Sequence, residues 1–316
     1  MDESWNKLKT YIFNLQKTNY VDCLVPTYRC PNKSIRAHSI QKKGVLDLLS
    51  ENGHIYRIKN ELDRVFWERE GINKATTFKG LCNKHDTEIF REIDSNPINL
   101  ENPYHLFLLA YRSVLREMTV LIDGALRNLQ GFRKKVSLGL LDDEEPSFEE
   151  ARMNGLFVNA EEFYEIKRLF DNIYLSEELS KIKHKTIIIE NIRPAIAISS
   201  IFTYAETKVK SEDTERIILN VYPENNSLIV VFSYRNTDEE YIEARISNVI
   251  ESKGMNQLYQ LSKMVLRNCY NFIVSPILYR SWDEDRKNIM LDFFFKTATQ
   301  DLINYEDERL FLFWDK

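Results

Sequence analysis

The chain has 316 residues and a net charge of −5, with 43% hydrophobic and 29% charged side chains. This length predicts two or three compact units, and the acidic balance argues against a wholly basic nucleic-acid binder. No apolar run approaches the roughly 20 residues that a membrane span needs, and the first residues, MDESWNKLKT, lack the apolar core of a secretory signal. These features predict a cytoplasmic protein with no membrane partner, and four cysteines are too few for a disulfide framework.

Residues 1–100 predict a small, irregular domain. A short helical pattern at 4–17 is followed by a long stretch with few sustained helical periods. Between Cys23 and His85 there are twelve basic and six acidic side chains, which predicts a basic module on an acidic body, although a solvated surface accounts for the same count. The polar segment SNPINLENPY at 95–104 contains two prolines and predicts a linker.

Residues 101–316 predict a second, larger α+β domain. Asn102 and Pro103 are typical of a helix start, and helical patterns cover 102–183. Short β-branched and aromatic runs then predict an antiparallel sheet with hairpin connections over 185–235: KTIIIEN, PAIAISSIFTY, RIILNVYP and NSLIVVFSYR. Helical patterns return over 238–300. The order of irregular module, helices, sheet and helices predicts the α+β fold class.

Three of the four cysteines and one histidine have the spacing of a metal site. Cys23 and Cys30 lie on a loop with two prolines, and Cys82 and His85 form a C-x₂-H pair just before the helical pattern DTEIFREID. Thiolates and imidazole at such spacings suit tetrahedral Zn²⁺, and a ligand pair where a helix begins is typical of a treble-clef knuckle. We therefore predict a structural zinc ion with these four ligands. His38 competes for the fourth position, and is otherwise available for catalysis or for a buried hydrogen bond.

The segments AHSIQ and GLCNKHD resemble the HNH, or ββα-metal, nuclease pattern, in which A-H-I-x-P precedes an L-C-x-x-C-H segment. The resemblance implies that His38 is the general base acting on water and that Cys82 and His85 are the second zinc pair. Asp86 stands where that family has a metal-binding histidine, and Gln41 where it has proline. Two interpretations of this module therefore remain: a working nuclease centre, or a zinc scaffold whose active site has decayed.

A second resemblance covers more of the chain. The similarity to segments of bacterial anti-phage zinc-finger proteins, and most of all to the ring-activated zinc-finger RNase type, lies in Cys23 and Cys30 followed by IRAHSIQKKGVLDLL and NGHIY, and in ATTFKGLCNKHDTEIFREID, LFLLAYRSVLRE and LRNCYNFIVSP. The resemblance implies a toxin that cleaves RNA and arrests growth when a phage protein is sensed. It also implies self-association as a homo-oligomer, with the zinc module sensing or folding and the body carrying the nuclease.

RNA chemistry needs a base, an acid and a cation for the phosphate. The candidates beyond the zinc module are Arg112, Glu117, Arg235 and Asn271. AYRSVLRE places Arg112 and Arg116 on one helix face, with Glu117 beside them. Arg235 follows the last predicted strand, where loops often carry function, and Asn271 lies near a helix end in RNCYNFIVSP. Salt bridges and capping networks are the structural alternatives for these side chains.

Three functions stay open from the sequence. The first is a zinc-scaffolded ribonuclease toxin with an RNA substrate and a phage-protein trigger. The second is an HNH-like, metal-dependent DNA endonuclease with His38 as its base and a cation near Asp86, and the third is a non-enzymatic zinc-finger sensor or adaptor. P-loop, dinucleotide-binding, zincin and serine-hydrolase motifs do not occur in the chain, which argues against those chemistries.

Overall fold

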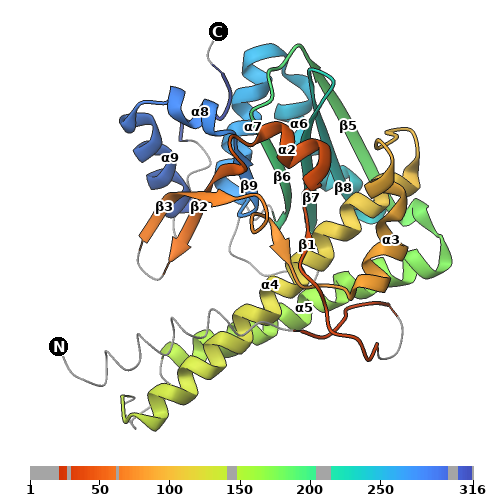
Figure 1. Ribbon diagram of the computed structural model, residues 1–316, viewed down its shortest axis with the longest axis vertical. Coiled ribbons are helices and arrows are strands. Elements are labelled where there is room, and N and C mark those ends of the chain that lie inside the picture. The colour runs from red at the N-terminus through yellow and green to blue at the C-terminus, as the bar shows by residue number, and fades with distance from the viewer. Residues whose placement is uncertain are drawn as a thin grey trace. The chain divides into compact units, whose positions relative to one another are not determined.

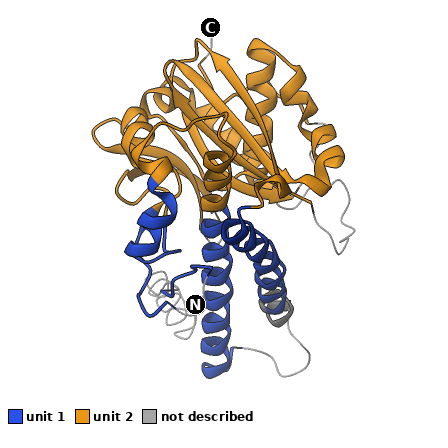
Figure 2. Ribbon diagram, turned by 90° about the vertical axis from the view of Figure 1, so that its right-hand side faces the viewer, with its two compact units in different colours: residues 1–37, 78–91, 114–177 blue, residues 38–77, 92–113, 178–316 orange. Residues whose placement is uncertain are grey.

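The computed structural model divides the chain into two compact units, each built from separate stretches of sequence (Figure 1, Figure 2). The structure describes residues 21–26, 30–61, 64–140, 148–203, 215–297 and 305–314, so the helix predicted at 4–17 lies outside the described residues. Unit 1 comprises residues 1–37, 78–91 and 114–177, and unit 2 comprises 38–77, 92–113 and 178–316. The boundary predicted at residue 100 coincides with none of these limits, because the first hundred residues contribute to both units.

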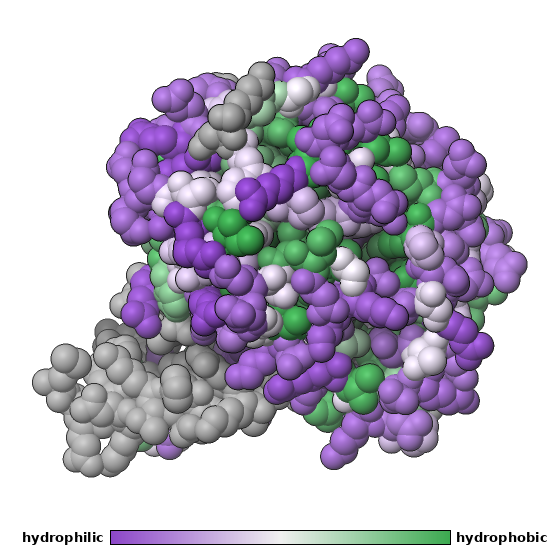
Figure 3. All heavy atoms as spheres, turned by 45° about the horizontal axis from the view of Figure 1, so that its top comes forward, coloured by the Kyte–Doolittle hydropathy of each residue, from purple (hydrophilic) through white to green (hydrophobic). Residues whose placement is uncertain are grey.

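Hydrophilic side chains predominate on the face of the molecule shown in Figure 3, where hydrophobic side chains gather in smaller groups between them. In the described part of the chain, none of the helices combines the length and the apolar character that a membrane crossing requires.

Unit 2 is built on a seven-stranded sheet in which every recorded strand pair is antiparallel. Its strand order is β3-β2-β9-β6-β7-β8-β5. The strands are β2 (His54–Glu61), β3 (Arg64–Gly71), β5 (Ile182–Glu190), β6 (Ile196–Thr203), β7 (Arg216–Glu224), β8 (Ser227–Arg235) and β9 (Phe272–Val274). The predicted α+β fold, with an antiparallel sheet flanked by helices, is confirmed.

The central strands β6, β7 and β8 are buried along nearly their whole length. Burial on both faces explains why they appear in the sequence as continuous apolar runs instead of alternating ones. The hairpin between β7 and β8 turns at Asn225 and Asn226, whose φ angles are both positive. Asparagine tolerates this left-handed conformation, and the turn joins RIILNVYP to NSLIVVFSYR, two of the runs for which the sequence predicts hairpin connections.

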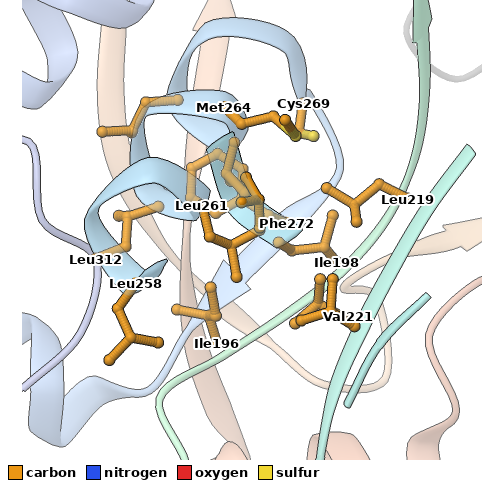
Figure 4. Close-up of a cluster of buried hydrophobic side chains, with 14 of the residues drawn as sticks. Ile196, Ile198, Leu219, Val221, Leu258, Leu261, Met264, Cys269, Phe272 and Leu312 are labelled. Carbon is orange, nitrogen blue, oxygen red and sulfur yellow. The ribbon is translucent and has the colours of Figure 1, made fainter. Parts of the chain in front are cut away.

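Helices cover one face of this sheet and enclose the larger hydrophobic core (Figure 4). They are α6 (Glu239–Glu251), α7 (Gly254–Asn268), α8 (Pro276–Ser281) and α9 (Glu284–Thr297). Along α7, Leu258, Leu261 and Met264 recur at helical spacing, and they lie over Ile196 and Val221 of the sheet. Burial of this stripe explains why the amphipathic pattern in MNQLYQLSKMVLRN predicts the helix.

A second hydrophobic cluster lies on residues of the sheet that point away from the larger core. It includes Tyr222, Val231 and Ile273 from the strands, and residues from the π-helical turn η1 (Lys42–Leu46) and the short helix α2 (Asp47–Leu49). Leu106, near the start of α4 (Pro103–Ser137), completes it. The two clusters together bury both faces of the central strands.

Unit 1 contains most of α4 and all of α5 (Phe148–Ser176), which lie beside each other in both views (Figure 1, Figure 2). Phe163 and Phe170 of α5 are buried, as are Leu115 and Met118 of α4. The first turns of α3 (Asn83–Ser95) also belong to this unit. The remaining elements are the two-stranded sheet of β1 (Ala37–His38) with β4 (Thr77–Phe78), and the 3₁₀ turns η2 (Leu179–Lys181) and η3 (Asn236–Asp238).

Two element predictions differ from the structure. The helical pattern predicted to reach residue 183 ends at Ser176, because Glu177 has a positive φ of 59° and strand β5 already begins at Ile182. The hairpin of β2 and β3 was not predicted, because HIYRIKNE and RVFWEREG are rich in charged and polar residues, and glutamate, lysine and asparagine are disfavoured in strands.

His184 on β5 makes the stability of unit 2 sensitive to acid. Its Nδ1 lies 2.8 Å from Ser233 Oγ, and its Nε2 is buried with no hydrogen-bond partner among the described residues. Burial lowers the pKa of His184 to about 4, from about 6.5 in an unfolded chain. The fold therefore favours the neutral ring, so this stabilisation is complete above pH 6.5 and is lost as the pH falls towards 4.

We expect the free energy of unfolding to fall by roughly 2 to 3 kcal/mol between pH 7 and pH 4 through this group. Urea denaturation of His184→Asn should show a smaller pH dependence than the unmodified protein, because asparagine keeps a polar partner for Ser233 but does not titrate. His54→Asn, at a histidine that bonds only the nearby Asn52 carbonyl, is the matched control. Equal pH dependence in all three proteins would contradict this assignment.

Candidate metal centre

The predicted ligands Cys23, Cys30, Cys82 and His85 converge in unit 1. Their ligand atoms all lie within 4.8 Å of one another. Two backbone hydrogen bonds join the segments that carry them. Leu24 N–H donates to the Gly80 carbonyl at 2.7 Å, and Ile35 N–H donates to the Leu81 carbonyl at 2.8 Å. The loop before β1 and the turn before α3 are therefore held side by side, with one ligand pair on each.

The distances between the ligand atoms fit a tetrahedral metal ion. Cys30 Sγ lies 3.7 Å from Cys82 Sγ, and His85 Nδ1 lies 3.4 Å from Cys23 Sγ and 3.3 Å from Cys82 Sγ. A tetrahedron with zinc–sulfur bonds of about 2.3 Å has edges of about 3.8 Å between sulfurs and slightly less from sulfur to nitrogen. The four side chains are therefore spaced as one ion would require.

The start of α3 positions Cys82 and His85. Cys82 precedes the first residue of the helix, and its carbonyl accepts a hydrogen bond from Asp86 N–H at 2.9 Å, which closes the first turn. The spacing of three residues brings His85 back over Cys82. The positive end of the helix dipole at this terminus favours a thiolate. The prediction that the second ligand pair sits where a helix begins is consistent with this geometry.

The pKa values of Cys23 and Cys82 are shifted in opposite directions. Burial raises the pKa of Cys23 to about 11. Burial also acts to raise the pKa of Cys82, but hydrogen bonds from the His85 backbone and from the thiols of Cys30 and Cys23 outweigh it and lower that pKa. Of these two thiols, Cys82 is therefore the better prepared to lose its proton to a metal, and its own N–H donates to Cys23 Sγ at 3.2 Å.

His38 lies in unit 2 and is not one of the four clustered ligands. Its Nε2 lies 2.8 Å from the carbonyl oxygen of Ile72. A carbonyl only accepts hydrogen bonds, so Nε2 must carry the proton and the neutral ring keeps its lone pair on Nδ1. His38 therefore has the tautomer that a general base acting through Nδ1 requires.

The other candidate side chains are engaged in structural contacts. Arg112 is buried and makes a bidentate ion pair with Asp94, at 2.9 and 2.7 Å. Glu117 pairs with the adjacent Arg116 at 2.7 Å. Arg235 reaches Asp238 at 2.8 Å, across the turn that follows β8. Each of these charges thus has a partner of opposite sign, which is the structural alternative that the sequence left open.

Asn271 is buried at the start of β9 and belongs to a polar network. Its side-chain amide donates to Ser39 Oγ at 2.9 Å and to the Ser199 carbonyl at 2.6 Å, and its backbone N–H donates to Ser200 Oγ. Four of the five catalytic candidates, all except Glu117, fall in unit 2. The described contacts do not join them into one catalytic set.

Sequence reasoning missed the polar side chains inside the sheet of unit 2. Ser113 Oγ lies 2.9 Å from Ser199 Oγ and 3.1 Å from Asn220 Oδ1, and all three residues are buried. The available signal was Asn220 itself, a single amide within the apolar run RIILNVYP. A polar residue in a fully buried strand needs partners, so it marks a place where the core is not purely hydrophobic.

The cluster of three cysteines and His85, the imidazole of His38 and the buried polar network are thus the candidate functional features of the described residues. Comparison of the chain with family models, with curated proteins and with solved structures gives no match.

Proposed function

We propose that the Cys23, Cys30, Cys82 and His85 cluster holds a structural Zn²⁺ ion. Three thiolates and one imidazole are a donor set that zinc prefers, and four protein ligands complete a tetrahedral shell without a position for water. Such a shell favours a scaffold over a catalytic metal, because catalytic zinc keeps one open position. The ion would fix the loop at 23–30 to the start of α3.

We propose further that the protein is a zinc-scaffolded ribonuclease of anti-phage defence. In this proposal a phage protein triggers it, RNA is its substrate and the active form is a homo-oligomer. The observation that carries the proposal is the convergence of the four ligands, because they come from the same segments that carry the resemblance to anti-phage zinc-finger proteins. The cleavage of RNA is supported by that resemblance and by the tautomer of His38.

His38 is the residue that we assign as general base. Its Nε2–H is held by the Ile72 carbonyl, which fixes the ring and leaves Nδ1 to accept a proton from a ribose 2′-hydroxyl. Nδ1 makes no hydrogen bond to any residue that the structure describes. Arg112, Glu117 and Arg235 already have charged partners, so the proposal assigns them no proton transfer.

His38→Ala is expected to reduce RNA cleavage at least about 100-fold, the effect of losing a general base. The measurement is the integrity of total RNA in cells that express the protein, with and without infection by a panel of phages. His54→Ala is the matched control, because this second histidine of unit 2 also has one ring nitrogen bound to a backbone carbonyl, and it should leave RNA cleavage unchanged.

Other outcomes of this experiment would replace the proposal. DNA cleavage that needs a divalent cation and is lost in His38→Ala would identify an HNH-like endonuclease. Growth arrest with intact RNA and DNA would identify a sensor or adaptor, which the structural ion pairs of Arg112, Glu117 and Arg235 favour. The ribonuclease, the DNA endonuclease and the sensor would all contain zinc, so measuring the zinc content does not distinguish them. It tests only whether the four-ligand cluster binds the ion.

A further inference from the structure

A partly open cavity of about 30 Å³ lies in unit 2, on the side of the sheet that faces η1 and the start of α4. Its walls are mainly aliphatic, and five polar residues line it: Ser39, Gln41, Arg112, Asn220 and Tyr222. One buried water needs about 10 to 15 Å³ of such space. The cavity therefore has room for a group of about two or three non-hydrogen atoms.

Two of these polar side chains have unused hydrogen-bonding groups. Asn220 and Tyr222 are only 4% and 7% exposed. Asn220 Oδ1 accepts a hydrogen bond from Ser113 Oγ, but Asn220 Nδ2 and the Tyr222 hydroxyl are buried without any partner among the described residues. Burying a polar group without a hydrogen-bond partner is unfavourable, so two such groups beside one cavity point to a molecule that binds there.

The chemistry of the unused groups restricts what can bind. The Asn220 amide nitrogen is a donor, and burial, followed by the charge of Glu224, raises the pKa of Tyr222, so that its hydroxyl also keeps a proton to donate. Among the residues that the structure describes, Arg112 is the only cation that lines the cavity, and it makes its bidentate pair with Asp94. The site thus offers neutral donors within aliphatic walls, and its positive charge is already compensated. This combination suits an uncharged acceptor better than an anion.

We propose that this cavity binds a small uncharged molecule through a carbonyl oxygen, of the class of simple carboxamides. The oxygen would accept from Asn220 Nδ2–H and from the Tyr222 hydroxyl. Acetamide has four non-hydrogen atoms, one or two more than the cavity encloses, so its apolar end would extend towards the open side of the cavity. The site is distinct from the metal centre, and it depends neither on zinc nor on RNA cleavage. A failure here therefore leaves the proposed function untouched, and the reverse also holds.

The test is a titration of the full-length protein, labelled with ¹⁵N-asparagine, with acetamide, with acetate and with inorganic phosphate in parallel. Acetamide should shift the side-chain amide signal of Asn220 in a saturable way, whereas acetate and phosphate at the same concentrations should not. Tyr222→Phe should weaken acetamide binding about tenfold, the loss expected for one hydrogen bond. The variant should fold, because it removes only an oxygen that has no partner among the described residues.

Tyr234→Phe is the matched control. Tyr234 is also buried on a neighbouring strand, but its hydroxyl bonds Glu243 and it does not line the cavity. The affinity of the Tyr234→Phe variant for acetamide should equal that of the unmodified protein. The proposal is overturned if acetamide gives no saturable shift, if phosphate or acetate binds more tightly than acetamide, or if Tyr222→Phe and Tyr234→Phe have the same affinity.

Discussion

Replacing Cys82 by serine is expected to release zinc and to unfold the part of unit 1 around the metal centre. The ligand atoms of Cys82, Cys23, Cys30 and His85 all lie within 4.8 Å of one another, and Cys82 is the thiol whose pKa is lowered. Structural zinc sites contribute an apparent 10 to 16 kcal/mol in small zinc modules, so losing one thiolate should remove most of the bound metal. Elemental analysis should find about one zinc per chain before the substitution and almost none after it.

Cys269→Ala is the control for this experiment. Cys269 is fully buried in the core of unit 2, where burial raises the pKa of its thiol to about 12, so it remains a thiol and is no metal ligand. This variant should keep its zinc. Zinc retained in Cys82→Ser, or lost equally in both variants, would contradict the assigned ligand set. Less than about half an equivalent in the unmodified protein would exclude the zinc site altogether.

Replacing Arg112 by methionine is expected to destabilise unit 2 by about 2 to 3 kcal/mol. The Arg112 side chain is 6% exposed and its two hydrogen bonds to Asp94 are charge-assisted, so methionine would fill the space without replacing them. Urea unfolding can be followed by tryptophan fluorescence, because Trp67, Trp282 and Trp314 belong to unit 2.

The matched control is Arg168→Met, which breaks a pair with Glu165 on the surface of α5. Both side chains of that pair are about 60% exposed, and exposed helical pairs contribute only about 0.3 to 0.5 kcal/mol. A similar small change in both variants would show that the Arg112–Asp94 pair does not stabilise unit 2. Loss of RNA cleavage by Arg112→Met without loss of stability would instead restore Arg112 as a phosphate-binding residue.

The metal ligands could be predicted from the sequence because their positions follow from local geometry. The C-x₂-H spacing at the start of a helix brings Cys82 and His85 together through local geometry alone. Completing the ligand set required only the further expectation that the loop carrying Cys23 and Cys30 lies beside this pair. The central strands could also be predicted, because short β-branched and aromatic runs divided by turn residues are typical of strands.

The candidate catalytic side chains could not be resolved in the same way. Arg112 and Arg116 share a helix face, but Asp94 and Glu117 decide what each arginine binds, and the pairing with Asp94 depends on tertiary structure. The hairpin of β2 and β3 was missed for a similar reason. Its Arg57–Glu70 and Lys59–Glu68 pairs lie across strands, so the charges that conceal the strands in the sequence stabilise the hairpin in the fold.

The strand order of unit 2 has a consequence for biosynthesis. Tyr56 of β2 is paired with Val274 of β9, so the hairpin of β2 and β3 joins the rest of the sheet only after β9 has been made. At translation rates of about 5 to 20 residues per second, the ribosome needs roughly 10 to 45 seconds to produce the intervening chain. A nascent chain that does not yet include β9 therefore cannot assemble this sheet, so unit 2 is completed only after residue 274 has been synthesised.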